Sequence, residues 1–205
     1  MLSIDFSKKL SSEFYQQDLL KSAKKLLGKL LVRKIAEDNF LVGKIVETEA
    51  YTKENDEASH SFRGKTKSNS IMFEGGGKLY VYFTYGMYFC SNVVIGKVDQ
   101  GEAVLIRALE PAAGIDEMSI NRFGKVKLTK KESINLANGP GKLSIALNIS
   151  KKDNGTNLLG NEIFILDNNE IDKKEIITSK RIGISKSIDL PWRFYIKDNP
   201  YVSRK

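Results

Sequence analysis

The sequence predicts an α+β fold: a single mixed domain with a curved, mostly antiparallel β-sheet and flanking helices. Two observations carry this prediction. Strand-like apolar runs outnumber helical stretches, and the two kinds of element do not alternate regularly, as they would in a doubly wound parallel sheet. The chain also lacks internal repeats, low-complexity tracts and linker-like runs of Pro, Gly or Ser. We therefore expect residues 1–205 to form one domain.

The elements follow from local patterns. Asp18 to Leu27 places apolar side chains at helical spacing and ends at Gly28, so an amphipathic helix packed on the core is expected. Helices are also predicted at 113–122 and 141–147. Strands are predicted at 30–35, 40–49, 79–84, 87–95, 103–109 and 163–166, the first two joined by a polar turn around residues 37–39.

Composition limits the class of protein. With 205 residues, 41% hydrophobic and 28% charged, the chain is long enough for a full core, which excludes global disorder, collagen and coiled coil. No stretch approaches the roughly 18 apolar residues of a membrane span, and residues 1–10 do not resemble a secretion signal. Cys90 is the single cysteine, so no intramolecular disulfide can form and we expect a cytoplasmic protein.

The charge balance favours a polyanionic partner. Lys and Arg total 33 against 25 Asp and Glu, a formal net charge of +8. Such a balance is typical of nucleic-acid-binding proteins. The excess comes mainly from scattered lysines, which genomic composition bias also produces. Charge alone therefore leaves both interpretations open.

Several chemistries are excluded by missing residues. His60 is the only histidine, so with one cysteine no Cys/His zinc site can form, and a Ser-His-Asp triad would have to use His60. No Gly-x-Ser-x-Gly segment presents a nucleophile. The glycine-rich segments at 75–78 and 138–142 lack the leading Gly and the final Ser or Thr of a phosphate-binding loop. We interpret the first as a turn and the second as a helix start.

The most informative segment is the strand that ends at Tyr51. Period-two geometry places Glu47, Glu49 and Tyr51 on one face and residues 46, 48 and 50 on the other. A solvated sheet face would look the same. However, the only imidazole follows at His60 and three tyrosines follow at 80–85, so acids and aromatic rings together suggest a stacking pocket that contains a proton-accepting group.

These residues carry a resemblance to the alkyladenine (3-methyladenine, or methylpurine) DNA glycosylase family, and the motifs extend over about nine tenths of the chain. Strong matches are IVETEAY at 45–51, ASHS at 58–61, MF at 72–73, LYVY at 79–82, YGMYFC at 85–90, NVV at 92–94 and VLIRALEP at 104–111. Weaker ones are GPGKL at 139–143, RIGI at 181–184 and RFY at 193–195. The resemblance implies hydrolysis of the N-glycosidic bond of a damaged purine that has been flipped out of duplex DNA.

The resemblance also assigns catalytic roles. Glu49 would be the general base that activates a water for attack on the sugar, and Arg107 would help to orient that water. The main-chain carbonyl of Ile182 would do likewise. Glu47 is the rival carboxylate, and the family motif rather than geometry favours Glu49.

By the same resemblance, Tyr51, His60 and Tyr82 would sandwich the flipped base. Asn92 would crowd the amino group of guanine and so exclude a normal base. Tyr85 would intercalate and fill the gap left in the duplex.

Lys142 would contact the DNA backbone. A lysine at a helix start that lies in solvent is nearly as good an interpretation. Three departures from the family pattern stand out: Lys53 replaces a customary Gly, Ser68 replaces Arg, and Tyr88 replaces a frequent His. Lys53 puts the conformation of the loop at 52–55 in doubt, because Lys tolerates left-handed backbone angles poorly.

We therefore expect a monofunctional DNA glycosylase that acts as a monomer on double-stranded DNA with damaged purines, needs no cofactor or metal, and leaves an abasic site. The substrates implied are 3-methyladenine, 7-methylguanine, hypoxanthine and ethenoadenine. Two alternatives remain: a module that keeps the fold and binds DNA without catalysis, and a different hydrolase that uses His60.

Overall fold

The structure is a computed structural model, and it describes residues 5–84 and 86–203. The strands are β1 (Leu30–Ala36), β2 (Asn39–Tyr51), β3 (Leu79–Thr84), β4 (Tyr88–Ile95), β5 (Glu102–Ala113), β6 (Ile163–Leu166), β7 (Ile176–Ser179) and β8 (Arg193–Ile196). The α-helices are α1 (Ser12–Tyr15), α2 (Leu19–Lys25), α3 (Ile115–Phe123), α4 (Lys130–Asn135) and α5 (Pro140–Ala146). Short 3₁₀ helices lie at η1 (Phe6–Lys8), η2 (Ser70–Phe73), η3 (Lys151–Asp153) and η4 (Lys173–Glu175).

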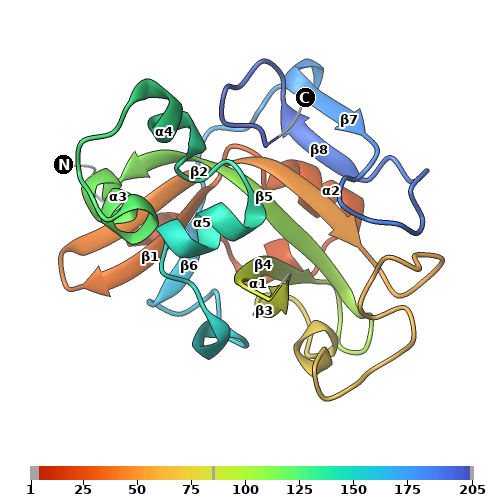
Figure 1. The fold of residues 1–205 in the computed structure, drawn as a ribbon. Helices are drawn as coiled ribbons and strands as arrows, with labels where there is room; N and C mark the ends of the chain where they lie inside the picture. The colour runs from red at the N-terminus through yellow and green to blue at the C-terminus, as the bar shows by residue number, and fades with distance from the viewer. Residues whose placement is uncertain (1–4, 85, 204–205) are drawn as a thin grey trace.

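The strands form an open antiparallel sheet in the order β3-β4-β5-β2-β1-β6, with β7 and β8 attached as a branch (Figure 1). Every pairing between these strands is antiparallel. The predicted α+β class is therefore confirmed.

The two long strands β2 and β5 form the centre of the sheet. On the side away from β5, the first part of β2 pairs with β1, from Asn39 opposite Ala36 to Lys44 opposite Leu30. The later part pairs with β8, from Glu47 opposite Tyr195 to Glu49 opposite Arg193. The register between β2 and β5 shifts on either side of Glu47. The acidic end of β2 is thus enclosed by strands on both sides.

Alternation along the strands gives the two faces of the sheet different environments. One face carries Thr48 and packs against α2 and α5: the Thr48 hydroxyl donates to the carbonyl of Ala23 at 2.9 Å, and Ser91 meets Ser144 at 3.1 Å. Leucines, valines and isoleucines complete this core. The other face carries Glu47 and Glu49, and a smaller apolar cluster around Met72, Phe73 and Tyr80. The helices therefore leave the acidic face free for a site.

The predicted elements are found with small shifts at their ends. The predicted 113–122 helix begins later, because Ala113 still belongs to β5, opposite Val42, and Gly114 with φ 71° turns the chain before α3. The short elements β7, β8, α1 and α4 were not predicted. Lys53 does not have a positive φ, whereas Asn55 does at 57°, so the glycine replacement does not strain the loop.

The glycine-rich segment at 75–78 is a turn packed on Tyr15, which confirms that interpretation. A Cβ atom at Gly76 would lie 2.0 Å from the backbone oxygen of Tyr15. No helix in the described ranges has the length and apolar character needed to cross a membrane.

We predict that Gly76→Ala destabilises the fold by about 2 kcal/mol, because the added methyl group meets backbone rather than a movable side-chain end. Urea unfolding measures the change. Gly139→Ala is the matched control, since its Cβ would meet Lys142 at an ordinary 3.5 Å. A loss at Gly76 no larger than the loss at Gly139 would contradict this account of the turn.

Candidate active site

A cleft of about 630 Å³ opens on the acidic face of the sheet. Its walls come from β2 to β5, from the segments at 57–60 and 138–142, and from residues 182–186. The sequence-predicted residues that line it are Tyr51, His60, Tyr82, Asn92, Arg107, Lys142 and Ile182. The structure therefore brings together residues that are up to 131 positions apart, as from Tyr51 to Ile182 (182 − 51). Tyr85 lies outside the described residues.

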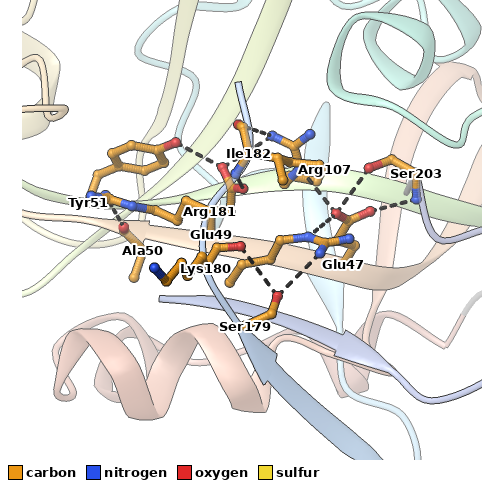
Figure 2. Close-up of polar contacts among 11 residues, drawn as sticks. Glu47, Glu49, Ala50, Tyr51, Arg107, Ser179, Lys180, Arg181, Ile182 and Ser203 are labelled. Atoms are coloured by element: carbon orange, nitrogen blue, oxygen red, sulfur yellow. Dashed lines mark hydrogen bonds and ion pairs between the residues drawn. The ribbon is translucent and has the colours of Figure 1, made fainter. Parts of the chain in front are cut away.

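Glu49 lies directly behind the cleft lining and is fully buried. Its carboxylate accepts hydrogen bonds from the backbone N–H of Ile182 at 2.9 Å, the hydroxyl of Tyr51 at 2.8 Å and Nη1 of Arg107 at 3.1 Å (Figure 2). All three partners line the cleft. A carboxylate offers about four lone-pair directions, so this set leaves one open for a further donor.

Glu47, although also fully buried, has different partners. Its carboxylate accepts from Nε of Arg107 at 3.1 Å and Nε of Arg193 at 2.7 Å. Ser203 adds its backbone N–H at 2.7 Å and its hydroxyl at 3.0 Å. Two strands and the C-terminal segment therefore converge on Glu47. This set of bonds suits a carboxylate that holds the scaffold together.

Arg107 links the two carboxylates. It is nearly buried, and its guanidinium bonds Glu47 and Glu49 and also reaches the Ile182 carbonyl at 3.4 Å. Burial acts to lower the pKa of Arg107, but the charges of Glu49 and Glu47 outweigh it and the pKa is raised. The predicted shared face of Glu47, Glu49 and Tyr51 is thus confirmed: Arg107 contacts both acids, and the Tyr51 hydroxyl contacts Glu49.

The aromatic walls are fixed by contacts of their own. His60 and Tyr82 meet edge to face with ring centroids 4.4 Å apart, and Nδ1 of His60 lies 2.9 Å from the hydroxyl of Tyr80. Partial burial lowers the pKa of His60, and burial raises the pKa of Tyr80 to about 12. The pKa values of Tyr51 and Tyr82 are also raised, mainly by burial. At neutral pH these rings are uncharged.

The two remaining lining residues also have defined partners. The amide of Asn92 is buried and donates to the carbonyl of Tyr80 at 3.1 Å. The ammonium of Lys142 donates to the side chains of Asn135 at 2.8 Å and Asn138 at 2.7 Å. Burial, with a further contribution from Arg122, lowers the pKa of Lys142. Lys142 is therefore held at the cleft and does not extend freely into solvent.

Sequence reasoning missed residues that hold the site from outside the cleft. Asn69 donates to the carbonyls of His60 at 2.8 Å and Gly64 at 3.0 Å and so fixes the loop that carries the imidazole. Arg181 and Asp56 form a fully buried ion pair, and Arg193 reaches Glu47. Both arginines belong to motifs that carry the family resemblance, at 181–184 and 193–195, which was the available signal for them.

This arrangement is able to bind a flat ring and to activate water. Aromatic side chains line a cleft of ligand size, and a buried carboxylate beneath them can act as general base. An α+β fold with a buried carboxylate behind an aromatic cleft is typical of an enzyme that acts on a ring-bearing substrate.

Comparison with known proteins specifies the family. Residues 13–200 match the family described as "Methylpurine-DNA glycosylase (MPG)". A protein of Clostridium novyi (strain NT) named "Putative 3-methyladenine DNA glycosylase" is 50% identical over 204 residues, which cover 97% of this chain and 100% of that protein.

Proteins of the same name in Francisella tularensis subsp. tularensis (strain WY96-3418) and Carboxydothermus hydrogenoformans are 54% and 49% identical. The first alignment covers 90% of this chain and 93% of that protein, and the second covers 96% and 99%. The chain belongs to the methylpurine-DNA glycosylase family. It is a hydrolase of N-glycosyl bonds in DNA that acts in base-excision repair.

We predict that Glu47→Gln destabilises the protein by about 3–5 kcal/mol, because it removes one charge from a buried network and leaves Arg107 and Arg193 poorly compensated. Urea unfolding measures this. Glu110→Gln is the control: Glu110 pairs with Lys44 at 2.6 Å but both side chains are about one third exposed, so its loss costs about 1 kcal/mol or less. Equal losses would show that Glu47 does not support the scaffold.

Proposed function

We propose that this enzyme flips alkylated or deaminated purines out of duplex DNA into the cleft and hydrolyses their N-glycosidic bond with a water activated by Glu49. The substrates would be 3-methyladenine, 7-methylguanine, hypoxanthine and ethenoadenine. The observation that carries this proposal is the position of Glu49: a buried carboxylate held by Tyr51, Arg107 and Ile182, each of which also lines the cleft.

The bonding of Glu49 is suited to a general base. Its Oε2 atom accepts from Tyr51 and Arg107, whereas Oε1 accepts from the Ile182 N–H alone. The remaining lone pair on Oε1 could hold a water at the cleft floor, where Arg107 and the Ile182 carbonyl would help to orient it. Glu47 is the weaker candidate, because its oxygens are taken by Arg107, Arg193 and Ser203.

When the purine is methylated, hydrolysis requires few catalytic groups besides the general base. A purine methylated at N3 or N7 already carries positive charge and leaves readily, so the enzyme mainly stabilises an oxocarbenium-like sugar and supplies the water. Neutral hypoxanthine and neutral ethenoadenine would also benefit from protonation. Because water is the nucleophile, the product would be an abasic site. The reaction would not need the nucleophilic amine that a lyase uses.

The cleft walls account for recognition of the base. Tyr51, His60 and Tyr82 would stack on it, each contact contributing roughly 1–3 kcal/mol. Their uncharged rings favour a cationic purine through the electron-rich ring faces. Asn92, fixed by the Tyr80 carbonyl, would crowd the amino group of guanine and so act against normal bases.

Contact with the rest of the DNA would come from Lys142 at the cleft and from the positive charge of the protein as a whole. Lys142 would meet a backbone phosphate at the cleft, and the net charge of +8 favours the duplex as a whole. Tyr85, in the chain between β3 and β4, would intercalate into the gap. We propose a monomer of one domain for this task.

The first test is single-turnover release of base from duplexes that contain ethenoadenine or hypoxanthine, with alkali-labile abasic sites as the readout. We predict that Glu49→Gln keeps binding to lesion DNA but lowers excision by about 100-fold or more, the contribution of general-base catalysis. Glu110→Gln, the surface control, should excise like the wild type.

Two results would overturn this assignment. If the wild type binds lesion DNA tightly but excises neither these lesions nor methylated bases, the protein is a binding module. If wild type and Glu49→Gln excise equally, the base is Glu47 or His60.

The lowered pKa of His60 generates a second prediction. Because partial burial lowers the pKa of His60 below its ordinary value of 6.5, the ring becomes charged at lower pH than an exposed imidazole, and the charged ring would repel a cationic base. In a Glu49→Gln background, the preference for 7-methylguanine duplex over undamaged duplex should fall as the pH drops below 6.5. With His60→Gln added, the preference should not change with pH. The same decline in both proteins would exclude His60 as its cause.

A further inference from the structure

A buried ion pair outside the catalytic groups connects several parts of the candidate site. Nη1 of Arg181 bonds Oδ2 of Asp56 at 2.7 Å and Nη2 bonds Oδ1 at 2.6 Å, so the two side chains meet in parallel. Both side chains are fully buried. Removing two charges from water is costly, and a bidentate geometry of this kind is what offsets the cost.

From this pair Arg181 reaches the acidic strand. Its Nη1 atom also donates to the carbonyl of Ala50 at 2.9 Å, between Glu49 and Tyr51 (Figure 2). Its guanidinium carbon lies 4.5 Å from the centre of the Tyr51 ring, so the cation covers a ring whose hydroxyl bonds Glu49. The next residue in the chain, Ile182, supplies the N–H that binds Glu49.

Asp56 organises the loop that leads to His60. Its carboxylate accepts from the backbone N–H groups of Thr52 at 3.3 Å and Ala58 at 3.2 Å, and its carbonyl accepts from the N–H of Ser59 at 2.9 Å. One side chain therefore fixes both ends of the loop between Tyr51 and His60.

We propose that Asp56 and Arg181 are positioning residues for excision, which together hold Glu49, Tyr51 and the His60 loop in their working geometry. This inference rests on the proposed function. Arg181 contacts Tyr51, and Asp56 contacts Ala58; both Tyr51 and Ala58 line the cleft. Neither Arg181 nor Asp56 lines the cleft itself. A misplacement of about 1 Å at a reacting group can lower a rate by about 100-fold.

The test compares Arg181→Lys with Arg181→Met in single-turnover excision of ethenoadenine from duplex DNA at saturating enzyme. Lysine keeps the charge but cannot make two parallel bonds or cover the ring in the same way. We expect both variants to lose at least about tenfold in rate constant, within that 100-fold range. Kd for the same duplex should rise by a smaller factor.

The rate constant and the active fraction separate positioning from simple stabilisation. If the pair only stabilised the fold, a burst measured with duplex in excess would show fewer active molecules, and the single-turnover rate constant would be unchanged. The control is Arg33→Lys, which makes the same substitution in another Arg–carboxylate pair, Arg33 to Asp153 at 2.6 Å, between β1 and η3 away from the cleft. It should keep the wild-type rate constant.

A second variant and a spectroscopic measurement keep the test decisive if an Arg181 variant does not fold. Asp56→Asn keeps the side-chain volume but removes one acceptor, and it should show the same loss of rate constant. Trp192 is the single tryptophan of the chain, and Arg181 lies 5.5 Å from its ring, so its emission should shift in the Arg181 and Asp56 variants and not in Arg33→Lys.

The outcomes are distinct. Wild-type rate constants in Arg181→Lys or Asp56→Asn, or a reduced active fraction alone, would overturn the positioning role and leave the glycosylase assignment intact. Absence of excision by the wild type would overturn the proposed function itself, and with it the role of the pair.

Discussion

The site depends on one buried cation, Arg107, held between two carboxylates on the central strands of the sheet. An unpaired charge at this depth would be costly, as would either acid without its partner. Arg107 bonds both Glu47 and Glu49, at 3.1 Å each, and the position of each group is therefore fixed by the others. The remaining partners of the two acids divide their roles: Arg193 and Ser203 fix Glu47 in the scaffold, and Tyr51 and Ile182 fix Glu49 at the cleft.

The sheet makes this arrangement possible through strand alternation. Thr48 points to the helices and bonds Ala23, while its neighbours on either side point to the charged face. A shift of one residue in β2 would exchange the buried acids with core residues. The irregular register beside Glu47 lies where the strand changes partner from β1 to β8. Packing on one face and the candidate site on the other are thus both positioned by β2.

Much of this was predictable from short patterns. The strand at 40–49 and the shared face of Glu47, Glu49 and Tyr51 follow from period-two spacing, and β3 and β6 were predicted at their observed bounds. The contact of Asp56 with Arg181 was not, because 125 residues separate the two and no local period relates them. The four-residue strands β7 and β8 were not predicted for a similar reason: β8 pairs with the distant strand β2, and β7 pairs with β8.

The distribution of these partners along the chain affects how the protein is made. Glu49 precedes the Ile182 amide by 133 residues, and Glu47 precedes Arg193 by 146 and Ser203 by 156. At translation rates of about 5–20 residues per second, the two acids therefore leave the ribosome on the order of ten seconds before the groups that bury them. Until then the carboxylates must remain hydrated, and the central strand cannot close its charged face. Assembly of the buried charged network is therefore delayed until residues 182–203 have been synthesised.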